Sequence, residues 1–205
     1  MYSGTWAAVA PDKPALIMAG SGRTLTYAEL DERSLRLANH LRGLGLQTGD
    51  VVALLSDNTP ETYEVYWAAL RSGLYITAVN HNLTAAEASY IIEDCDARAL
   101  VVSAGKAQVV EGLDVAVEHR LVYGGKITGY GDYESALEAA GTAPLPEQPH
   151  GDDLLYSSGT TGRPKGIKLP LPEIRVDEPG YRYVTIFGGL YGFDEVSVYL
   201  SQIGR

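Results

Sequence analysis

One short stretch, Tyr156 to Lys168 (YSSGTTGRPKGIK), combines the residue types that proteins use to hold phosphate. Glycines let the backbone turn tightly and point its N–H groups at an anion, hydroxyls add hydrogen-bond donors or a metal contact, and a lysine adds a positive charge. The apolar run Leu154-Leu155-Tyr156 at its start is typical of a strand. The stretch therefore predicts a strand that runs into a phosphate-binding loop.

The Walker A loop is the commonest glycine-rich loop that ends in a lysine, but its spacing does not fit this sequence. Counting from Gly159, the second glycine of that motif falls on Pro164. The hydroxyl residue that should follow Lys165 is Gly166. These two positions exclude a Walker A loop.

The segment from Ser157 to Gly166 instead resembles the signature loop of the adenylate-forming superfamily, which comprises acyl-CoA synthetases, luciferases and peptide-synthetase adenylation domains. That loop reads Ser/Thr, Ser/Gly, Gly, Ser/Thr, Thr, Gly, any residue, Pro, Lys, Gly, and every position matches. LTYAEL from Leu25 and GLQTGDVVAL from Gly45 also look like the N-terminal region of acyl-CoA synthetases. The later KLPLPE and LYGFDE segments look most like the fatty acyl-CoA ligase branch.

The resemblance implies a two-step, ATP-dependent ligase. A fatty acid or another carboxylate attacks the α-phosphate of Mg-ATP to give an acyl-adenylate and pyrophosphate, and coenzyme A then displaces AMP. The implied roles are phosphate contacts for Thr160, Thr161 and Gly162, a place near Mg²⁺ for Ser157, and a pyrophosphate contact for Lys165. The full set of implied cofactor-binding residues is Ser157, Ser158, Gly159, Thr160, Thr161, Gly162, Lys165 and Gly166.

The family pattern continues beyond what this sequence contains. Adenine-binding and ribose-binding motifs and a C-terminal domain with the adenylation lysine follow in the family, whereas this sequence reads QIGR from Gln202. We therefore expect a truncated ligase with no complete catalytic set, which alone does not form acyl-CoA. The alternative is a non-catalytic interaction module with weak phosphate or ATP binding. It would self-associate as a homodimer or larger through the apolar segment from Tyr181 to Leu200.

Composition and charge narrow the class of protein. The 205 residues are 45% hydrophobic and 20% charged, as in soluble globular chains. A net charge of −10 argues against nucleic-acid binding. Without a signal-peptide pattern or a transmembrane run, the sequence predicts a cytoplasmic protein. Cys95 is the single cysteine and is expected to be buried; surface or capping roles are expected for His40, His81, His119 and His150.

Alternating strand and helix patterns predict an α/β fold, a parallel sheet with helices on both faces as in flavodoxin-like and Rossmann-like layering. Capping boxes at Thr26 and Thr84 and a proline at residue 60 mark three helix starts. In the helix that follows Pro60, Glu61 and Glu64 are expected to form a solvated face. Helices are predicted over 27–43, 61–71, 85–94, 106–117 and 133–140, and strands over 51–55, 74–79, 99–102, 121–123 and 154–156.

The proline-rich stretch TAPLPEQPHG divides the sequence into parts. We expect an α/β subdomain over 1–141, a connector over 142–151, and, over 152–205, the phosphate-loop strand and the start of a second subdomain. Ligands of open parallel sheets bind beyond the carboxyl ends of the strands, which is where the predicted loop would lie.

Overall fold

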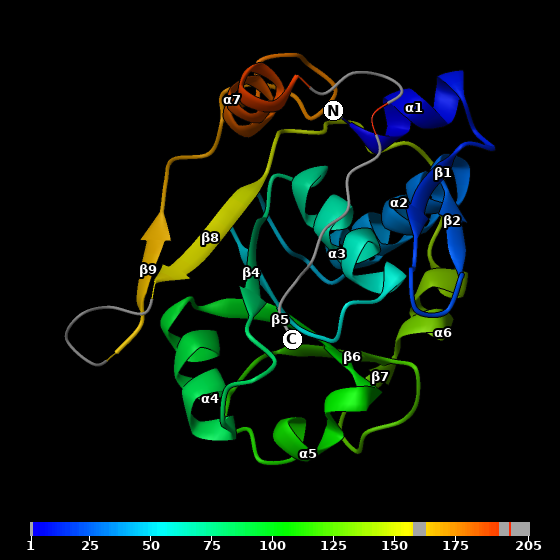
Figure 1. The fold of residues 1–205 in the computed structure, drawn as a ribbon. Helices are drawn as coiled ribbons and strands as arrows, with labels where there is room; N and C mark the ends of the chain where they lie inside the picture. The colour runs from blue at the N-terminus through cyan, green and yellow to red at the C-terminus, as the bar shows by residue number, and fades with distance from the viewer. Residues whose placement is uncertain (1, 158–162, 193–196, 198–205) are drawn as a thin grey trace.

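The computed structural model describes residues 2–157, 163–192 and 197. A seven-stranded sheet runs through it in the order β7-β6-β5-β3-β4-β8-β9 (Figure 1). All neighbouring strands are parallel except β8 and β9, so the predicted parallel sheet is confirmed up to its last strand. The strands are β3 (Val51–Leu55), β4 (Tyr75–Val79), β5 (Ala97–Ser103), β6 (His119–Tyr123), β7 (Gly131–Asp132), β8 (Asp152–Ser157) and β9 (Lys165–Lys168).

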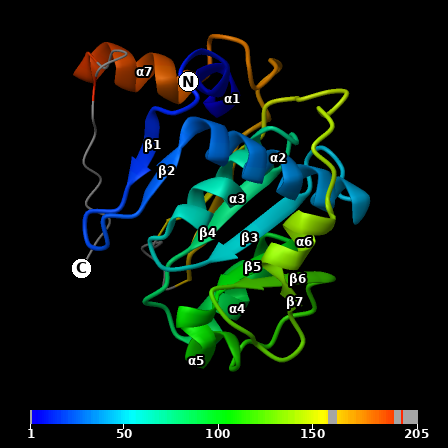
Figure 2. The same cartoon turned by 90° about the vertical axis from the view of Figure 1, so that its right-hand side faces the viewer.

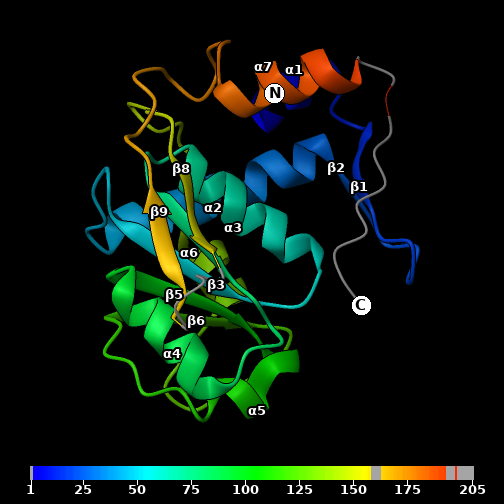
Figure 3. The same ribbon diagram turned by 60° about the vertical axis from the view of Figure 1, so that its left-hand side comes forward.

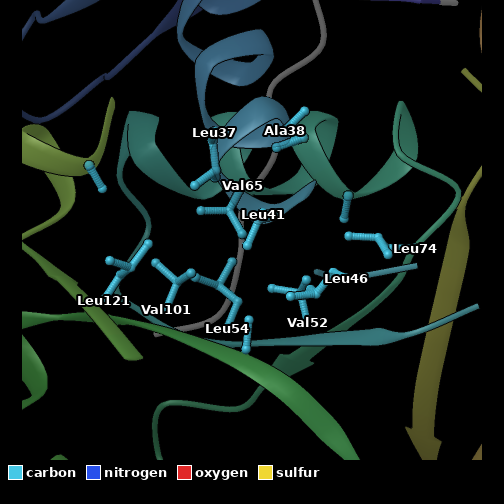
Figure 4. Packing of buried hydrophobic residues seen from close by; sticks show 14 of the residues in the cluster. Leu37, Ala38, Leu41, Leu46, Val52, Leu54, Val65, Leu74, Val101 and Leu121 are labelled. Carbon is cyan, nitrogen blue, oxygen red and sulfur yellow. The ribbon is translucent and has the colours of Figure 1, made fainter. Parts of the chain in front are cut away.

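Helices cover both faces of the sheet, as predicted (Figure 2). Helices α2 (Tyr27–Gly43), α3 (Pro60–Leu70) and α6 (Tyr133–Ala139) pack on one face, and α4 (Ala85–Asp94) and α5 (Ala107–Val110) on the other. Strand β3 is buried along its whole length because its side chains alternate between these layers. Val52 and Leu54 join the cluster under α2 and α3 (Figure 4), and Ala53 and Leu55 join the cluster under α4.

The predicted helix starts are confirmed in atomic detail. Thr26 Oγ1 accepts a hydrogen bond from the Glu29 backbone N–H at 3.2 Å, and the Thr26 N–H donates to Glu29 Oε2 at 2.8 Å. Thr84 and Glu87 repeat this capping box at the start of α4. Pro60 occupies the first turn of α3. These local signals are short-range, which is why sequence alone located them.

Some elements differ from the prediction. The helix expected over 106–117 is a 3₁₀ turn, η1 (Ala104–Lys106), followed by α5, which ends at Val110. Beyond it, the Asp114 N–H donates to Ser89 Oγ at 3.0 Å, and the Val115 carbonyl accepts from Arg120 Nη2 at 2.6 Å. These backbone groups are satisfied by other elements, so the helix does not continue. Elements missing from the prediction include α1 (Ser3–Val9), the antiparallel hairpin of β1 (Pro14–Ile17) and β2 (Thr24–Thr26), and the strands β7 and β9.

Buried polar side chains correct two further expectations. Glu61 and Glu64, expected on a solvated face, are 8% and 0% exposed. Arg33 of α2 and Tyr133 of α6 hydrogen-bond to Glu64, and Arg23, which lies just before β2, pairs with Glu61 at 2.8 Å. His150, expected at the surface or at a cap, is 3% exposed and stacks on Tyr181 at 4.0 Å between ring centroids. Cys95 is buried, as predicted.

The last described helix, α7 (Arg182–Tyr191), lies level with α1, above α3 and away from the sheet (Figure 3). Its exposed apolar side chains are Val184, Ile186, Phe187, Leu190 and Tyr191. The rest of the apolar segment expected to mediate contacts, 193–196 and 198–200, lies outside the described residues. None of the helices in the described part of the chain is long and apolar enough to cross a membrane.

Candidate functional site

The two strands that flank the glycine-rich loop pair directly with each other. Ser157, the last residue of β8, lies opposite Lys165, the first residue of β9, in an antiparallel register. Both residues are exposed. Of the predicted cofactor-binding residues, the structure therefore brings Ser157, Lys165 and Gly166 together at one end of a two-stranded ribbon. Ser158, Gly159, Thr160, Thr161 and Gly162 lie outside the described residues.

Gly166 lies close to the Tyr156 side chain on the partner strand. A Cβ atom at residue 166 would lie 3.1 Å from Cζ and from the hydroxyl of Tyr156. The Tyr156 hydroxyl donates to Asp94 Oδ2 at 2.6 Å, which ties β8 to the end of α4. Burial and the Asp94 carboxylate raise the pKa of Tyr156, so this phenol stays a hydrogen-bond donor.

Helix α4 also holds the residues that precede β9. The Tyr90 hydroxyl donates to the Pro164 carbonyl at 3.2 Å, and the Arg163 guanidinium lies over the Tyr90 ring at 5.3 Å from its centroid. The described residues on both sides of the loop are therefore fixed to α4. These contacts position the backbone at Lys165 and do not involve the Lys165 ammonium group.

The other end of β8 is fixed by buried polar contacts. Asp152, 1% exposed, accepts a hydrogen bond from the Tyr181 hydroxyl at 2.8 Å and pairs with Arg182. The Gly151 N–H donates to the Leu70 carbonyl at 2.7 Å, and Thr77 Oγ1 donates to the Leu154 carbonyl at 3.2 Å. The strand that leads to the loop is thus anchored at its beginning to α3, β4 and α7.

A metal ion at this site would depend on the loop hydroxyls. Among residues 2–157, 163–192 and 197, no group of three or more His, Cys, Asp or Glu side chains could hold a metal ion. The exposed Ser157 hydroxyl at the end of β8 is a neutral oxygen donor of the kind that Mg²⁺ accepts beside phosphate oxygens.

Sequence reasoning missed a second polar group, at the carboxyl ends of β3, β5 and β6. Lys106 Nζ lies 2.6 Å from Asp57 Oδ1, and Ser103 Oγ donates to Asp57 Oδ2 at 3.3 Å. The Tyr123 hydroxyl lies 2.9 Å from Thr59 Oγ1. The sequence could have indicated this group, because each residue lies at or just beyond the end of a predicted parallel strand. The members form hydrogen bonds and an ion pair with one another.

Comparisons with known proteins agree on one family. The model of the AMP-binding enzyme family matches residues 4–174. The fatty acid–acyl-carrier-protein ligase ScoC of Streptomyces coeruleorubidus is 36% identical over 78% of this chain and 30% of that protein. Feruloyl-CoA synthase of an Amycolatopsis species is 36% identical over 72% of this chain and 28% of that protein. The chain therefore spans less than a third of the length of these relatives.

The same similarity holds in three dimensions. The crystal structure of the anthranilate CoA ligase AuaEII in complex with anthranoyl-AMP superposes with a TM-score of 0.72 at 29% sequence identity. The matched region covers 80% of this chain and 33% of that one.

Proposed function

Because this chain belongs to the AMP-binding enzyme family and is homologous to acyl-CoA ligases, we propose that it supplies the part of such a ligase that holds the phosphates of ATP. The observation that carries the proposal is the antiparallel pairing of Ser157 with Lys165. This pairing brings together a hydroxyl and an ammonium group at the two ends of a glycine-rich and hydroxyl-rich segment. Such a segment surrounds a phosphate with N–H, O–H and cationic donors.

The proposed reaction joins a carboxylic acid to a thiol at the expense of ATP. A carboxylate oxygen attacks the α-phosphorus, the bond from that phosphorus to the bridging oxygen breaks, and pyrophosphate leaves. The coenzyme A thiol then attacks the acyl carbonyl and AMP leaves with the former carboxylate oxygen. In this proposal, Thr160, Thr161 and Gly162 would contact the phosphates, Ser157 would lie beside Mg²⁺, and Lys165 would compensate the charge of the pyrophosphate. Their contribution is positioning and electrostatics.

For the acid substrate we propose only the class, a carboxylic acid. The relatives named above act on a fatty acid and on ferulate, an aliphatic and an aromatic carboxylate. A fatty acid is our finer proposal, from the KLPLPE and LYGFDE segments of the sequence.

Calorimetric titration of the purified chain with Mg-ATP, and then with pyrophosphate, tests the phosphate-binding role. We expect saturable binding with a Kd of about 1 mM, which corresponds to about −4 kcal/mol. Lys165→Ala should weaken it about tenfold. Lys168→Ala is the matched control, because this substitution removes the same charge from the other end of β9. There, Lys168 Nζ lies over the Tyr75 ring. Equal losses in both variants would show that only general charge attraction is measured, and would refute the assigned role of Lys165.

A further inference from the structure

A cavity of about 980 Å³ lies between α7, the N-terminal residues of α1, helix α3 and the beginning of β8. Figure 3 shows α7 at the level of α1, with α3 below them. The volume is at the upper end of the range for sites that bind small molecules. Neither Ser157 nor Lys165, the described residues at the two ends of the loop strands, is among the described residues that line it.

The walls of this cavity are rich in aromatic rings. Rings from α3 and from the N-terminus form one side, where Tyr2 and Trp67 meet edge to face at 5.8 Å between centroids. Rings from the start of α7 form the other side, where Tyr183 and Phe187 stack at 6.3 Å. Aromatic walls bind an apolar body, and their π faces attract a cation. The aromatic lining residues are Tyr2, Tyr66, Trp67, Tyr181, Tyr183 and Phe187.

The charged groups of the lining have one sign. Asp153, Asp177 and Glu178 line the cavity, whereas no lysine or arginine is among the described lining residues. Asp177 is paired with Arg175 at 2.9 Å. Burial lowers the pKa of His150, which keeps this imidazole neutral at pH 7. A ligand carboxylate would meet repulsion here, and a ligand cation would meet attraction.

Asp153 is the carboxylate placed to receive that cation. It is a half-buried residue of the cavity lining, and its Oδ2 accepts a hydrogen bond from the Tyr66 hydroxyl at 3.0 Å. The nearby Arg182 guanidinium is paired with Asp152 instead. Burial raises the pKa of Asp153, a sign that its negative charge is poorly compensated in the free protein.

We propose that this cavity binds an amphiphilic organic cation, an ammonium group on an aliphatic or aromatic body. The ammonium group donates to Asp153, and the apolar body packs between Trp67 and Phe187. This inference goes beyond the proposed ligase function, because the acids used by that reaction carry the opposite charge.

Three probes of matched length test the charge preference: n-octylammonium, n-octanoate and 1-octanol, each titrated calorimetrically into the purified chain. We expect saturable octylammonium binding at least about tenfold tighter than that of octanoate. Asp153→Asn retains the acceptor for the Tyr66 hydroxyl and should weaken octylammonium binding about fivefold or more. Phe187→Ala should weaken octylammonium and octanol binding alike. Lys165→Ala should leave all three unchanged, which separates this result from the test of the phosphate loop.

The matched control is Glu93→Gln, which removes one exposed carboxylate from α4 outside the cavity. Octylammonium should bind this variant as it binds the original chain. An equal loss in Glu93→Gln and Asp153→Asn would mean that the net negative charge alone attracts the probe, and it would overturn the proposal. Octanoate binding as tight as that of octylammonium would also overturn the proposal. The same holds if octylammonium shows no saturable binding to a chain whose circular dichroism spectrum shows that it is folded.

Discussion

Glu64 Oε1 lies 2.7 Å from Arg33 Nε, and the glutamate side chain of this ion pair is fully buried. The other carboxylate oxygen accepts a hydrogen bond from the Tyr133 hydroxyl at 2.9 Å, and Arg33 also pairs with Glu134 at 2.7 Å. Burial raises the pKa of Glu64, and the Arg33 charge and hydrogen bond oppose that rise. The group joins three helices of one layer, α2, α3 and α6, through a single carboxylate.

Replacing Glu64 should destabilise the fold strongly. Glu64→Ala leaves the buried Tyr133 hydroxyl and one side of the Arg33 guanidinium without their partner, so we expect a loss of about 3 kcal/mol in the free energy of unfolding. Urea denaturation measures this loss. Glu32→Ala is the control, because it breaks an ion pair with Arg36 whose glutamate is 57% exposed, and it should cost less than about 1 kcal/mol. If the two variants lost similar amounts of unfolding free energy, the burial of Glu64 would not explain its contribution to stability.

Gly151 should not tolerate any side chain. A Cβ atom there would contact the Leu74 carbonyl oxygen and lie 2.8 Å from the Ala69 carbonyl oxygen, both of them backbone atoms that cannot move aside alone. We expect Gly151→Ala to reduce the free energy of unfolding by about 3 kcal/mol. At Gly141 the nearest atom is 4.0 Å away, and Gly141→Ala should change stability by less than about 0.5 kcal/mol. Chemical denaturation of both variants decides the point.

The buried His150 should make the fold sensitive to mild acid. Burial lowers its pKa, so the folded state binds a proton less tightly than the unfolded state, in which the histidine pKa is about 6.5. The contribution of the neutral imidazole is therefore present above that pH and is lost as the pH falls through the lower pKa of the folded state. His150→Gln should show a smaller loss of stability between pH 7 and pH 5 than the original chain. Equal pH slopes would argue against a titrating His150.

The capping box of α4 should contribute a measurable share of stability. Thr84→Ala removes the hydroxyl that accepts from the Glu87 N–H and donates to Glu87 Oε2 at 2.7 Å, and it should cost about 1 kcal/mol. Thr84→Ser keeps the hydroxyl and should cost less than half as much. Thermal and urea unfolding of the pair would separate the cap from the loss of a methyl group. A serine variant as unstable as the alanine variant would reject the capping role.

The sequence predicted what depends on neighbours along the chain. A few consecutive residues determine each of these features: the capping boxes at Thr26 and Thr84, the buried strand β3, and the start of α3 at Pro60. The strand before the phosphate loop was found in the same way. Of the candidate site, the sequence predicted which residues flank the loop, and the structure added that β9 pairs antiparallel with β8.

The remaining features depend on which elements meet. The helical period places Glu61 and Glu64 on α3, but it does not show that Arg23 pairs with Glu61 or that α2 and α6 hydrogen-bond to Glu64. The helix expected beyond Val110 stops because the Asp114 N–H finds Ser89 on α4, a partner 25 residues away. His150 is buried by Tyr181, which follows it only after β8 and β9. Contacts of this kind leave no local pattern.

The position of β8 also has a consequence for how the chain acquires its fold. This strand docks on β4, and its hydrogen bond from Thr77 to the Leu154 carbonyl spans 77 residues. The strands β5, β6 and β7, which come between them in the chain, add to the opposite edge of β3. During synthesis, the five strands from β3 to β7 can therefore assemble while β8 is still being made. Strand β8 docks on β4 only after these strands have been made, and closing this long-range pairing should limit the folding rate.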